Sequence, residues 1–304
     1  MTDRDLAKLF ARRFIQRSDV KAIQFTRDSG PFKAGDYFPD TRIDAQKRPN
    51  NPNLPVGFNM DHLLAHLKGE RTYGHYLLDD DDTCKFFMFD VDLQPKGTYF
   101  SMPDWSDLPF KLYDDPAGQE EWYRERVVVG ADEGAPLRDL WVSRRRDAAD
   151  ARKWLKFQMK TIAHLFARQI REMGMPCVVA YSGSKGVHVY ALTGPVPAAE
   201  ARAGAYLCMD MVGEFTPKKG DNFFVHNNDD PIHGFQNFSV EIFPKQDSVK
   251  DKNLGNLVRL PLGTNFKNPK DPTFFIDMTT PIADFKPHPN PIKLLTEGDP
   301  FANA

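Results

Sequence analysis

The chain has 304 residues, a net charge of −2 and a hydrophobic fraction of 41%, which fit a globular protein and exclude a disordered or strongly basic one. No apolar run approaches the roughly 20 residues of a membrane-spanning helix, and the N-terminus lacks a signal-peptide pattern, so we expect a cytoplasmic protein with no membrane contact. The three cysteines are far apart and predict neither disulfides nor a zinc site.

The first predicted elements are two helices on either side of a stretch rich in proline and asparagine. Thr2 is a candidate N-cap for a helix whose apolar residues, among them Phe10 and Phe14, recur at helical spacing. After residues 48–55, a shorter helix around 63–67 is predicted to end at Gly69.

A buried strand is predicted over residues 85–93, because this run is rich in apolar and aromatic side chains. Only Asp90 and Asp92 interrupt its apolar part. From about 97 to 147 the chain is charged, contains prolines and is weakly periodic, which predicts an insertion.

The clearest pattern in the second half is an amphipathic helix over residues 150–173, closed by Gly174 and expected to pack on a sheet. A strand over 178–181, a turn over 182–186 and a strand over 187–192 follow it, with further strands at 238–243 and 257–260. The Pro-rich tail, about 268–304, is predicted to wrap the surface.

Side chains alternate between the two faces of a strand, so Asp90 and Asp92 project to the same side. Two such close carboxylates repel each other when both are ionised, and a divalent cation between them offsets that repulsion. Hard oxygen ligands favour Mg²⁺ or Mn²⁺. An Asp-x-Asp pair is also common in turns and on solvated strands, so the pair alone leaves that alternative open.

The segment from Tyr181 to Val189 has the composition of a phosphate-binding loop. Two glycines free the backbone to present N–H groups, two serines add hydroxyl donors and a lysine adds a cation. His188 is predicted to share the face of these donors, because the valines beside it alternate toward the core. The other interpretation is an ordinary Ser/Gly hairpin with a half-buried histidine. The candidate phosphate-binding residues are Ser182, Gly183, Ser184, Lys185, Gly186 and His188.

A third acidic position lies in the predicted strand 238–243. Glu241 faces away from its apolar neighbours, as a third metal ligand on a neighbouring strand would. Lys245 and Arg259 lie shortly after it and could neutralise a triphosphate. Taken singly, a glutamate such as Glu241 is more often a surface residue of a strand, and an arginine such as Arg259 is more often a salt-bridge partner.

Together the three blocks resemble the motifs of the archaeo-eukaryotic primase superfamily: hhhDhD in residues 87–92, SGxKGxH in 182–188, and a hydrophobic residue plus an acid at 240–241. Residues 66–78, 241–246 and 255–262 are similar to the primase domains of TOTE conflict systems and of CRISPR-associated primase-polymerases. The loop motif also resembles the polymerase domain of bacterial end-joining ligases. The likeness covers about residues 63–263 apart from the insertion.

The resemblance implies an α+β fold, in which an RRM-like antiparallel sheet carries the carboxylates and packs against a second α/β module. The whole chain, 1–304, would form one catalytic domain. Asp90, Asp92 and Glu241 would hold two Mg²⁺ or Mn²⁺ ions, and the loop with Lys245 and Arg259 would hold the triphosphate. Tyr73 and Tyr76 are further candidates to contact the nucleotide.

The implied activity is that of a DNA primase, a DNA or RNA polymerase, or both, which adds NTP or dNTP to a 3′-hydroxyl and releases pyrophosphate. The implied partners are a DNA template and primer, together with a helicase or another replication, repair or CRISPR-associated component. Two alternatives stay open. One is an end-joining or gap-filling polymerase without de novo priming, and the other is a metal-dependent phosphodiesterase or an inactive nucleic-acid-binding module.

Overall fold

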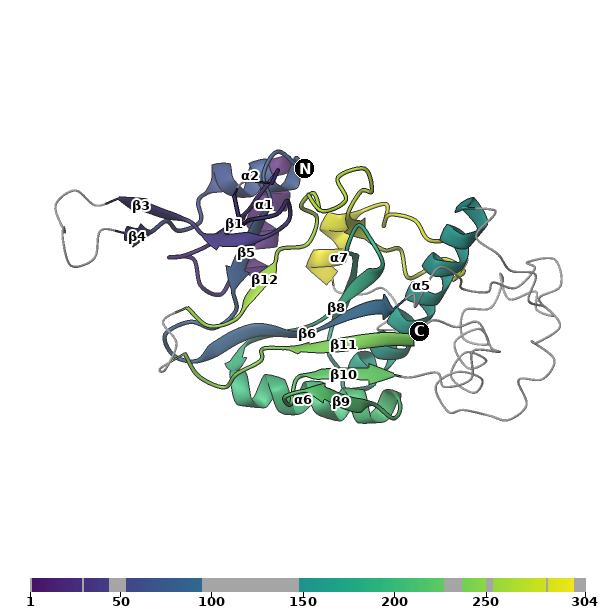
Figure 1. Ribbon diagram of the computed structural model, residues 1–304. Coiled ribbons are helices and arrows are strands. Elements are labelled where there is room, and N and C mark those ends of the chain that lie inside the picture. The colour runs from purple at the N-terminus through teal and green to yellow at the C-terminus, as the bar shows by residue number, and fades with distance from the viewer. Residues whose placement is uncertain are drawn as a thin grey trace, which may run out of the picture.

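Two antiparallel sheets and the helices beside them make up the computed structural model, which describes residues 2–28, 30–43, 53–94, 148–226, 237–249, 254–282 and 284–297 (Figure 1). The larger sheet has seven strands. In spatial order these are β13 (Phe274–Phe275), β7 (Cys177–Tyr181), β8 (Gly186–Pro197), β6 (Thr83–Gln94), β11 (Asn237–Phe243), β10 (Phe223–His226) and β9 (Thr216–Lys219).

The smaller sheet has four short strands, drawn largely from the N-terminal part of the chain. In spatial order these are β12 (Leu257–Arg259), β5 (Tyr73–Tyr76), β1 (Ala22–Gln24) and β2 (Tyr37–Pro39). Strands β3 (Thr41–Ile43) and β4 (Asn53–Pro55) form a separate two-stranded ribbon. In Figure 1 the smaller sheet lies across from β6 and β11 of the larger one.

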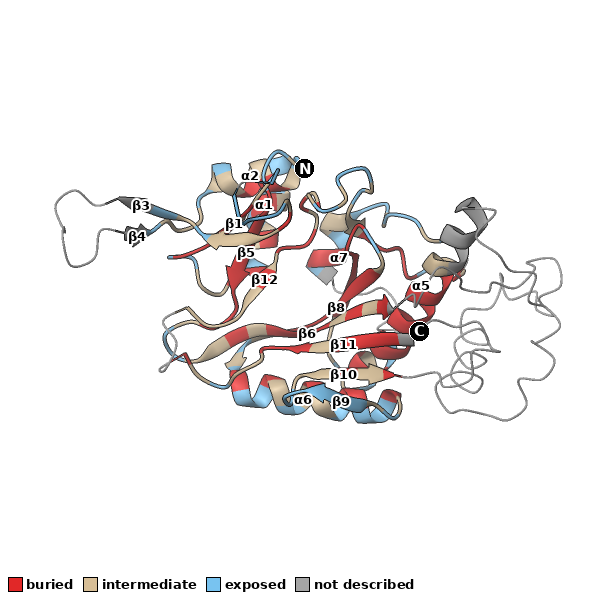
Figure 2. Ribbon diagram, in the orientation of Figure 1, coloured by how far each residue is buried: buried red, intermediate tan, exposed pale blue. Residues whose placement is uncertain are grey.

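Helices cover both sheets. The long helix α5 (Ala148–Glu172) and helix α6 (Ala198–Val212) pack on one face of the larger sheet. Helices α1 (Asp3–Phe14), α2 (Met60–Leu67) and α7 (Pro291–Glu297) share a second apolar core with the smaller sheet and the other face of the larger one. Figure 2 shows the buried residues concentrated on α5, β6, β8 and β11.

Strand β6 borders both cores because its side chains alternate. Phe87, Phe89 and Val91, each at most 1% exposed, belong to the core under α5 and α6. Phe86 and Met88 belong to the core shared with the smaller sheet. The residues that continue this second face are the two aspartates, so the local pattern of the strand directs both of them toward the space between the sheets.

Most predicted elements are confirmed. Thr2 caps α1 through a capping box with Asp5, and α2 is followed by Gly69 in the left-handed conformation with φ 73°. The amphipathic pattern over 150–173 corresponds to α5. The α+β prediction is likewise confirmed by the two antiparallel sheets and their helices.

The described part of the tail is mostly exposed or half-buried, but it also contributes core residues that the prediction did not include. Phe274 and Phe275 add the edge strand β13 to the larger sheet, and Leu294 and Leu295 of α7 are buried. Lys160 of α5 is also buried, and its Nζ donates to the backbone oxygens of residues 280, 281 and 284 at 2.9–3.0 Å. The tail therefore contributes residues to both cores in addition to its surface positions.

Some features were not predicted at all or lie outside the described residues. Helix α6 and the strands β1 and β2 are absent from the prediction, and the last two contribute to the site. The insertion predicted over about 97–147 lies outside the described residues. Among the residues that are described, no helix has both the length and the apolar character to cross a membrane.

Candidate active site

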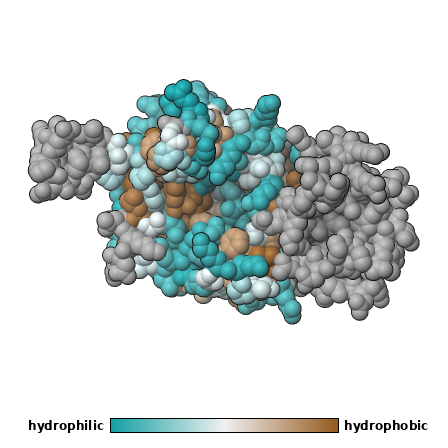
Figure 3. Space-filling model, in the orientation of Figure 1, coloured by the Kyte–Doolittle hydropathy of each residue, from teal (hydrophilic) through white to brown (hydrophobic). Residues whose placement is uncertain are grey.

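A pocket of about 480 Å³ opens between the two sheets. Its lining comes from β1, β2 and β12 of the smaller sheet, from β6, β8 and β11 of the larger sheet, and from the loop 182–185 and the segment that follows β12. Figure 3 shows hydrophobic side chains gathered in the hollow between the sheets and bordered by hydrophilic ones. Apolar lining residues include Met88, Phe243, Leu257 and Val258.

The register of the larger sheet brings the three predicted carboxylates together. Asp90 lies directly opposite Glu241 on β11, and Asp92 lies opposite Ser239. Residues opposite each other on antiparallel strands share a face, so all three carboxylates face the pocket, and all three line it. Their side chains keep 34%, 39% and 28% of their exposure, respectively, which leaves them accessible to a ligand.

The protein environment disfavours the charges on the two aspartates. Burial raises the pKa of Asp90 to about 6, and the negative charge of Glu241 raises it as well. Burial and the charge of Asp90 also raise the pKa of Asp92. Such a site is stabilised by any cation that enters it.

Two lysines supply positive charge to these carboxylates. Lys185 Nζ lies 3.4 Å from Asp92 Oδ2, and Lys245 forms an ion pair with Glu241 four residues before it. Within the described residues, no group of three or more acidic, histidine or cysteine side chains is arranged to hold a metal ion as it stands. The donor chemistry fits Mg²⁺ or Mn²⁺, because three carboxylates with hard oxygen atoms share one face. Their role as metal ligands stays a prediction.

The loop between β7 and β8 is held in a fixed shape. Ser182 N donates to Gly186 O at 3.0 Å, and Tyr181 Oη donates to Ser184 O at 2.9 Å. Gly183 has φ 77°, which favours glycine. A Cβ on Gly186 would lie 2.2 Å from Asp92 Oδ1, so this glycine makes room for the carboxylate. The loop and the acidic strand are therefore fitted to each other.

His188 lies between Asp90 and a buried tyrosine. Its Nε2 lies 3.4 Å from Asp90 Oδ1, and its Nδ1 lies 3.1 Å from Tyr190 Oη. Burial lowers the pKa of His188 to about 3, and the charge of Arg259 lowers it too, so the ring is neutral. A neutral ring that faces a carboxylate through Nε2 keeps its proton there, so Nδ1 accepts from the Tyr190 hydroxyl.

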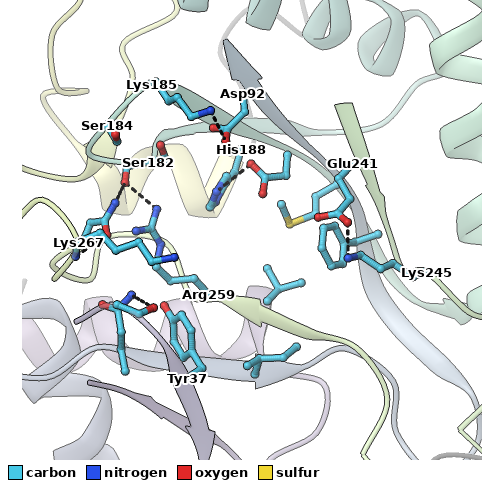
Figure 4. A pocket seen from close by; sticks show the side chains of 18 residues that line it. Tyr37, Asp92, Ser182, Ser184, Lys185, His188, Glu241, Lys245, Arg259 and Lys267 are labelled. Carbon is cyan, nitrogen blue, oxygen red and sulfur yellow. Dashed lines mark hydrogen bonds and ion pairs between the residues drawn. The ribbon is translucent and has the colours of Figure 1, made fainter. Parts of the chain in front are cut away.

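Arg259 joins the smaller sheet to the loop. Its Nη2 donates to Ser182 O at 2.8 Å, and Asn265 Nδ2 donates to the same oxygen at 3.0 Å. The two basic residues predicted to follow Glu241 thus lie on different sides of the pocket. Lys245 lies beside the carboxylates, and Arg259 lies beside the loop. Figure 4 shows both side chains with the loop residues and the carboxylates.

The structure does not place Tyr73 and Tyr76, the further candidates for nucleotide contact, in the lining of this pocket. Both are 5% exposed, and neither lines it. Tyr37 of the same sheet lines it instead, as do Gln24 and Lys267. Tyr37 and Gln24 lie far from the recognised motifs along the chain, whereas Lys267 lies shortly after the block 255–262. No local pattern marks any of the three as a site residue.

The fold and the site together define an α+β domain of the primase type, in which a carboxylate-bearing antiparallel sheet faces a cation-lined pocket. The model of the family "TOTE conflict system, Archaeo-Eukaryotic Primase domain" matches residues 5–298, and the chain belongs to this family. The family is one of primase-type nucleotidyltransferases, with nucleotides and nucleic acids as substrates. A comparison with curated proteins found no match.

Proposed function

We propose that this domain is a template-dependent nucleotidyl transferase, a DNA primase, a DNA or RNA polymerase, or both, which adds NTP or dNTP to a 3′-hydroxyl and releases pyrophosphate. The observation that carries the proposal is the convergence of Asp90, Asp92 and Glu241 on one face of the larger sheet, toward a pocket that Lys185 and Arg259 also line. A pocket of about 480 Å³ has the size of a small-molecule site.

The three carboxylates are the proposed ligands of two Mg²⁺ or Mn²⁺ ions, and archaeo-eukaryotic primase domains are generally metal-dependent. When bound, such ions supply charge neutralisation at the reacting phosphate and a lowered pKa of the attacking hydroxyl. Glu241 would exchange its lysine partner for a cation. The shared face of β6 and β11 would keep all three acids close to the same phosphate.

The other residues of the site would orient and neutralise the nucleotide. The backbone and hydroxyl groups of loop 182–185 would donate to phosphate oxygens, and Lys185 would add a positive charge. His188 would donate from Nε2 to a phosphate oxygen while Tyr190 holds its other nitrogen. Met88 lies on the same face of β6 as Asp90, and Phe243 lies on the same face of β11 as Glu241. These apolar residues line the pocket and would contact the base or sugar.

Primer extension tests the proposal. The wild-type chain should extend a labelled primer on a defined template with NTP or dNTP in Mg²⁺ or Mn²⁺, and Asp90→Ala/Asp92→Ala should not. A variant with undiminished extension would refute the assignment of these carboxylates. Product on an unprimed template would establish de novo priming and exclude a polymerase that only extends or joins ends.

A further inference from the structure

The loop 182–185 uses its backbone carbonyls and its backbone N–H groups in different ways. Each of its carbonyl oxygens accepts a hydrogen bond of 2.8–3.0 Å from a residue outside the loop. The donors are Arg259 and Asn265 to residue 182, Asn268 to residue 183, Tyr181 to residue 184 and Leu93 to residue 185. Within the part of the chain that the structure describes, the N–H groups of residues 183, 184 and 185 form no hydrogen bond. The loop therefore presents donors without partners, while each of its carbonyls is already bonded.

This difference decides whether the loop attracts or repels an anion. A phosphate oxygen is attracted by a peptide N–H and repelled by a carbonyl oxygen. The C=O and N–H of one trans peptide group point in opposite directions, so a bond that holds the carbonyl also fixes the N–H. Gly183 has φ 77°, and glycine adopts positive and negative φ with similar ease, so the sequence of the loop does not by itself fix the peptide groups beside it. Donors outside the loop must fix them.

The carbonyl of Gly183 is held by a residue that does not line the pocket. Asn268 Nδ2 donates to Gly183 O at 3.0 Å and to Asp271 Oδ2 at 2.6 Å. The carboxylate thus keeps the amide in the orientation that presents its donor to the loop. Asn265, which donates to the preceding carbonyl, lines the pocket and is open to direct contact with a ligand, whereas Asn268 is not part of the lining. An effect of Asn268 on a ligand therefore passes through the loop.

The segment 259–268, which carries three of these donors, is fixed to the smaller sheet and to α2. His66 Nδ1 accepts from Tyr73 N at 3.2 Å, so its Nε2 carries the proton and donates to Pro261 O at 2.8 Å. Thr72 Oγ1 donates to Thr264 O at 2.7 Å. The donors consequently hold the loop of the larger sheet at a defined place relative to the smaller one.

We propose that Asn268 is a positioning residue, which holds the carbonyl of Gly183 and thereby keeps the N–H of Ser184 available to a phosphate oxygen of the nucleotide. The inference rests on the proposed function, in which the loop receives the phosphates of NTP or dNTP. Without the amide of Asn268, the peptide group between Gly183 and Ser184 is free to turn over. Its carbonyl oxygen would then take the place of the N–H and repel the phosphate.

Selective isotope labelling observes this single peptide group. Gly183 and Ser184 form the only Gly-Ser pair in the sequence, so protein made with carbonyl-¹³C glycine and ¹⁵N serine gives one carbonyl–amide correlation. Asn268→Ala removes the donor, and Asn268→Asp replaces it with a carboxylate. Both variants should shift the correlation. Asn256→Asp is the matched control and should leave it in place, because this asparagine donates to a side chain outside the pocket.

Isothermal titration calorimetry with ATP in Mn²⁺ measures the consequence for binding. At pH 8 the affinity should fall about tenfold in Asn268→Asp and about threefold in Asn268→Ala, because a hydrogen bond is lost in both and a repelling charge is added in the first. A protonated carboxyl can donate to Gly183 O again. The deficit of Asn268→Asp relative to wild type at the same pH should therefore shrink toward pH 5, while that of Asn268→Ala should stay constant. Asn256→Asp should bind ATP as wild type does.

A correlation at the wild-type position in both Asn268 variants would overturn the proposal. A shifted correlation with wild-type affinity for ATP would overturn it as well, since the direction of the peptide group would then not matter to the ligand. Urea denaturation verifies that Asn268→Ala is folded. The failure of the proposed function is distinguishable: a chain whose ATP affinity depends on Asn268 but which extends no primer keeps this positioning role and rejects the polymerase.

Discussion

The residues on the two faces of strand β6 affect the stability of the protein in opposite ways, although they alternate along a single strand. On one face Phe87, Phe89 and Val91 are almost completely enclosed by the core under α5 and α6. On the other face Asp90 and Asp92 keep a third or more of their exposure and have raised pKa values. The first set stabilises the fold, and the second is held in an environment that disfavours its charge.

This difference explains how the strand can hold groups that are unfavourable by themselves. Unfavourable groups at functional sites persist when the surrounding structure is stable enough to impose them. Here the strand that carries the aspartates is paired on both sides, with β8 and β11, and its apolar face is packed against helices. The packing of one face thus fixes the positions of the acids on the other.

The largest effect should come from the acidic face. Asp90→Asn keeps the shape of the side chain but removes a proposed metal ligand, so primer extension should fall on the order of 10⁴-fold. Asp80→Asn, at a turn position whose side chain is 89% exposed, is the control and should extend primers normally. Steady-state extension rates measure both. Activity within tenfold of wild type for Asp90→Asn would remove this residue from the site.

Substitutions on the apolar face of β6 should lower the stability of the protein without acting directly on the reaction. Phe89→Ala removes an enclosed ring that contacts Phe87 and Phe166, so the free energy of unfolding should fall by about 3–5 kcal/mol. Phe32→Ala removes a ring that is 45% exposed and should cost at most about 1 kcal/mol. Urea denaturation gives both values. Equal losses in the two variants would mean that the core under α5 and α6 is not what holds β6.

Substitutions on the two faces of β6 should also differ in how their effect on stability depends on pH. The pKa of Asp90 in the folded protein, about 6, lies above its usual value of 3.8. The folded state therefore binds the extra proton between these values, and wild-type stability falls as the pH rises through that window. Asp90→Asn has no such charge, so in EDTA it should be more stable than wild type at pH 8, with a difference that disappears near pH 4.

Thermal unfolding between pH 4 and pH 8 measures this difference. Phe89→Ala provides the contrast, since its deficit should be the same at every pH. An Asp90→Asn variant that is less stable than wild type at pH 8 would show that the ionised carboxylate is favoured by its surroundings.

The smallest effect should come from the residue that orients His188. Tyr190→Phe removes the hydroxyl that donates to Nδ1 but keeps the buried ring, so extension should slow about three- to tenfold. Tyr206→Phe, which also loses hydroxyl hydrogen bonds but lies on α6 outside the pocket, should have no effect on extension. Long-range ¹H–¹⁵N spectra of His188 report its tautomer directly. An unchanged tautomer would show that the Tyr190 hydroxyl does not fix the proton of His188 on Nε2.

The sequence predicted the parts of the fold that depend on local pattern. The alternation in β6, the helical period of α5 and the glycines of the loop 182–186 are each contained within a short segment, and each element is present. Helix α6 escaped prediction because its alanine-rich sequence gives only a weak amphipathic pattern. The tail looked irregular because its buried residues belong to short elements that gain their stability only from contact with the rest of the protein.

The site could be predicted only where a motif marks it. The pairing of Asp90 with Glu241 follows from the register of β6 and β11, which no short segment encodes, and the family resemblance alone pointed to it. Tyr37 and Lys267 carry no motif, because a pocket wall is assembled from segments that meet only in the folded chain. The same reason explains why Tyr73 and Tyr76, which precede the aspartates in sequence, lie outside the pocket.

The central claim is that Asp90, Asp92 and Glu241 jointly bind divalent cations beside the phosphates of a nucleotide. A crystal structure with Mn²⁺ and a non-hydrolysable triphosphate tests it most directly, because anomalous scattering locates the manganese. The account predicts manganese bound by these three carboxylates, Lys245 released from Glu241, and a phosphate chain along the loop 182–185. Manganese elsewhere, or a nucleotide outside the space between the two sheets, would contradict it.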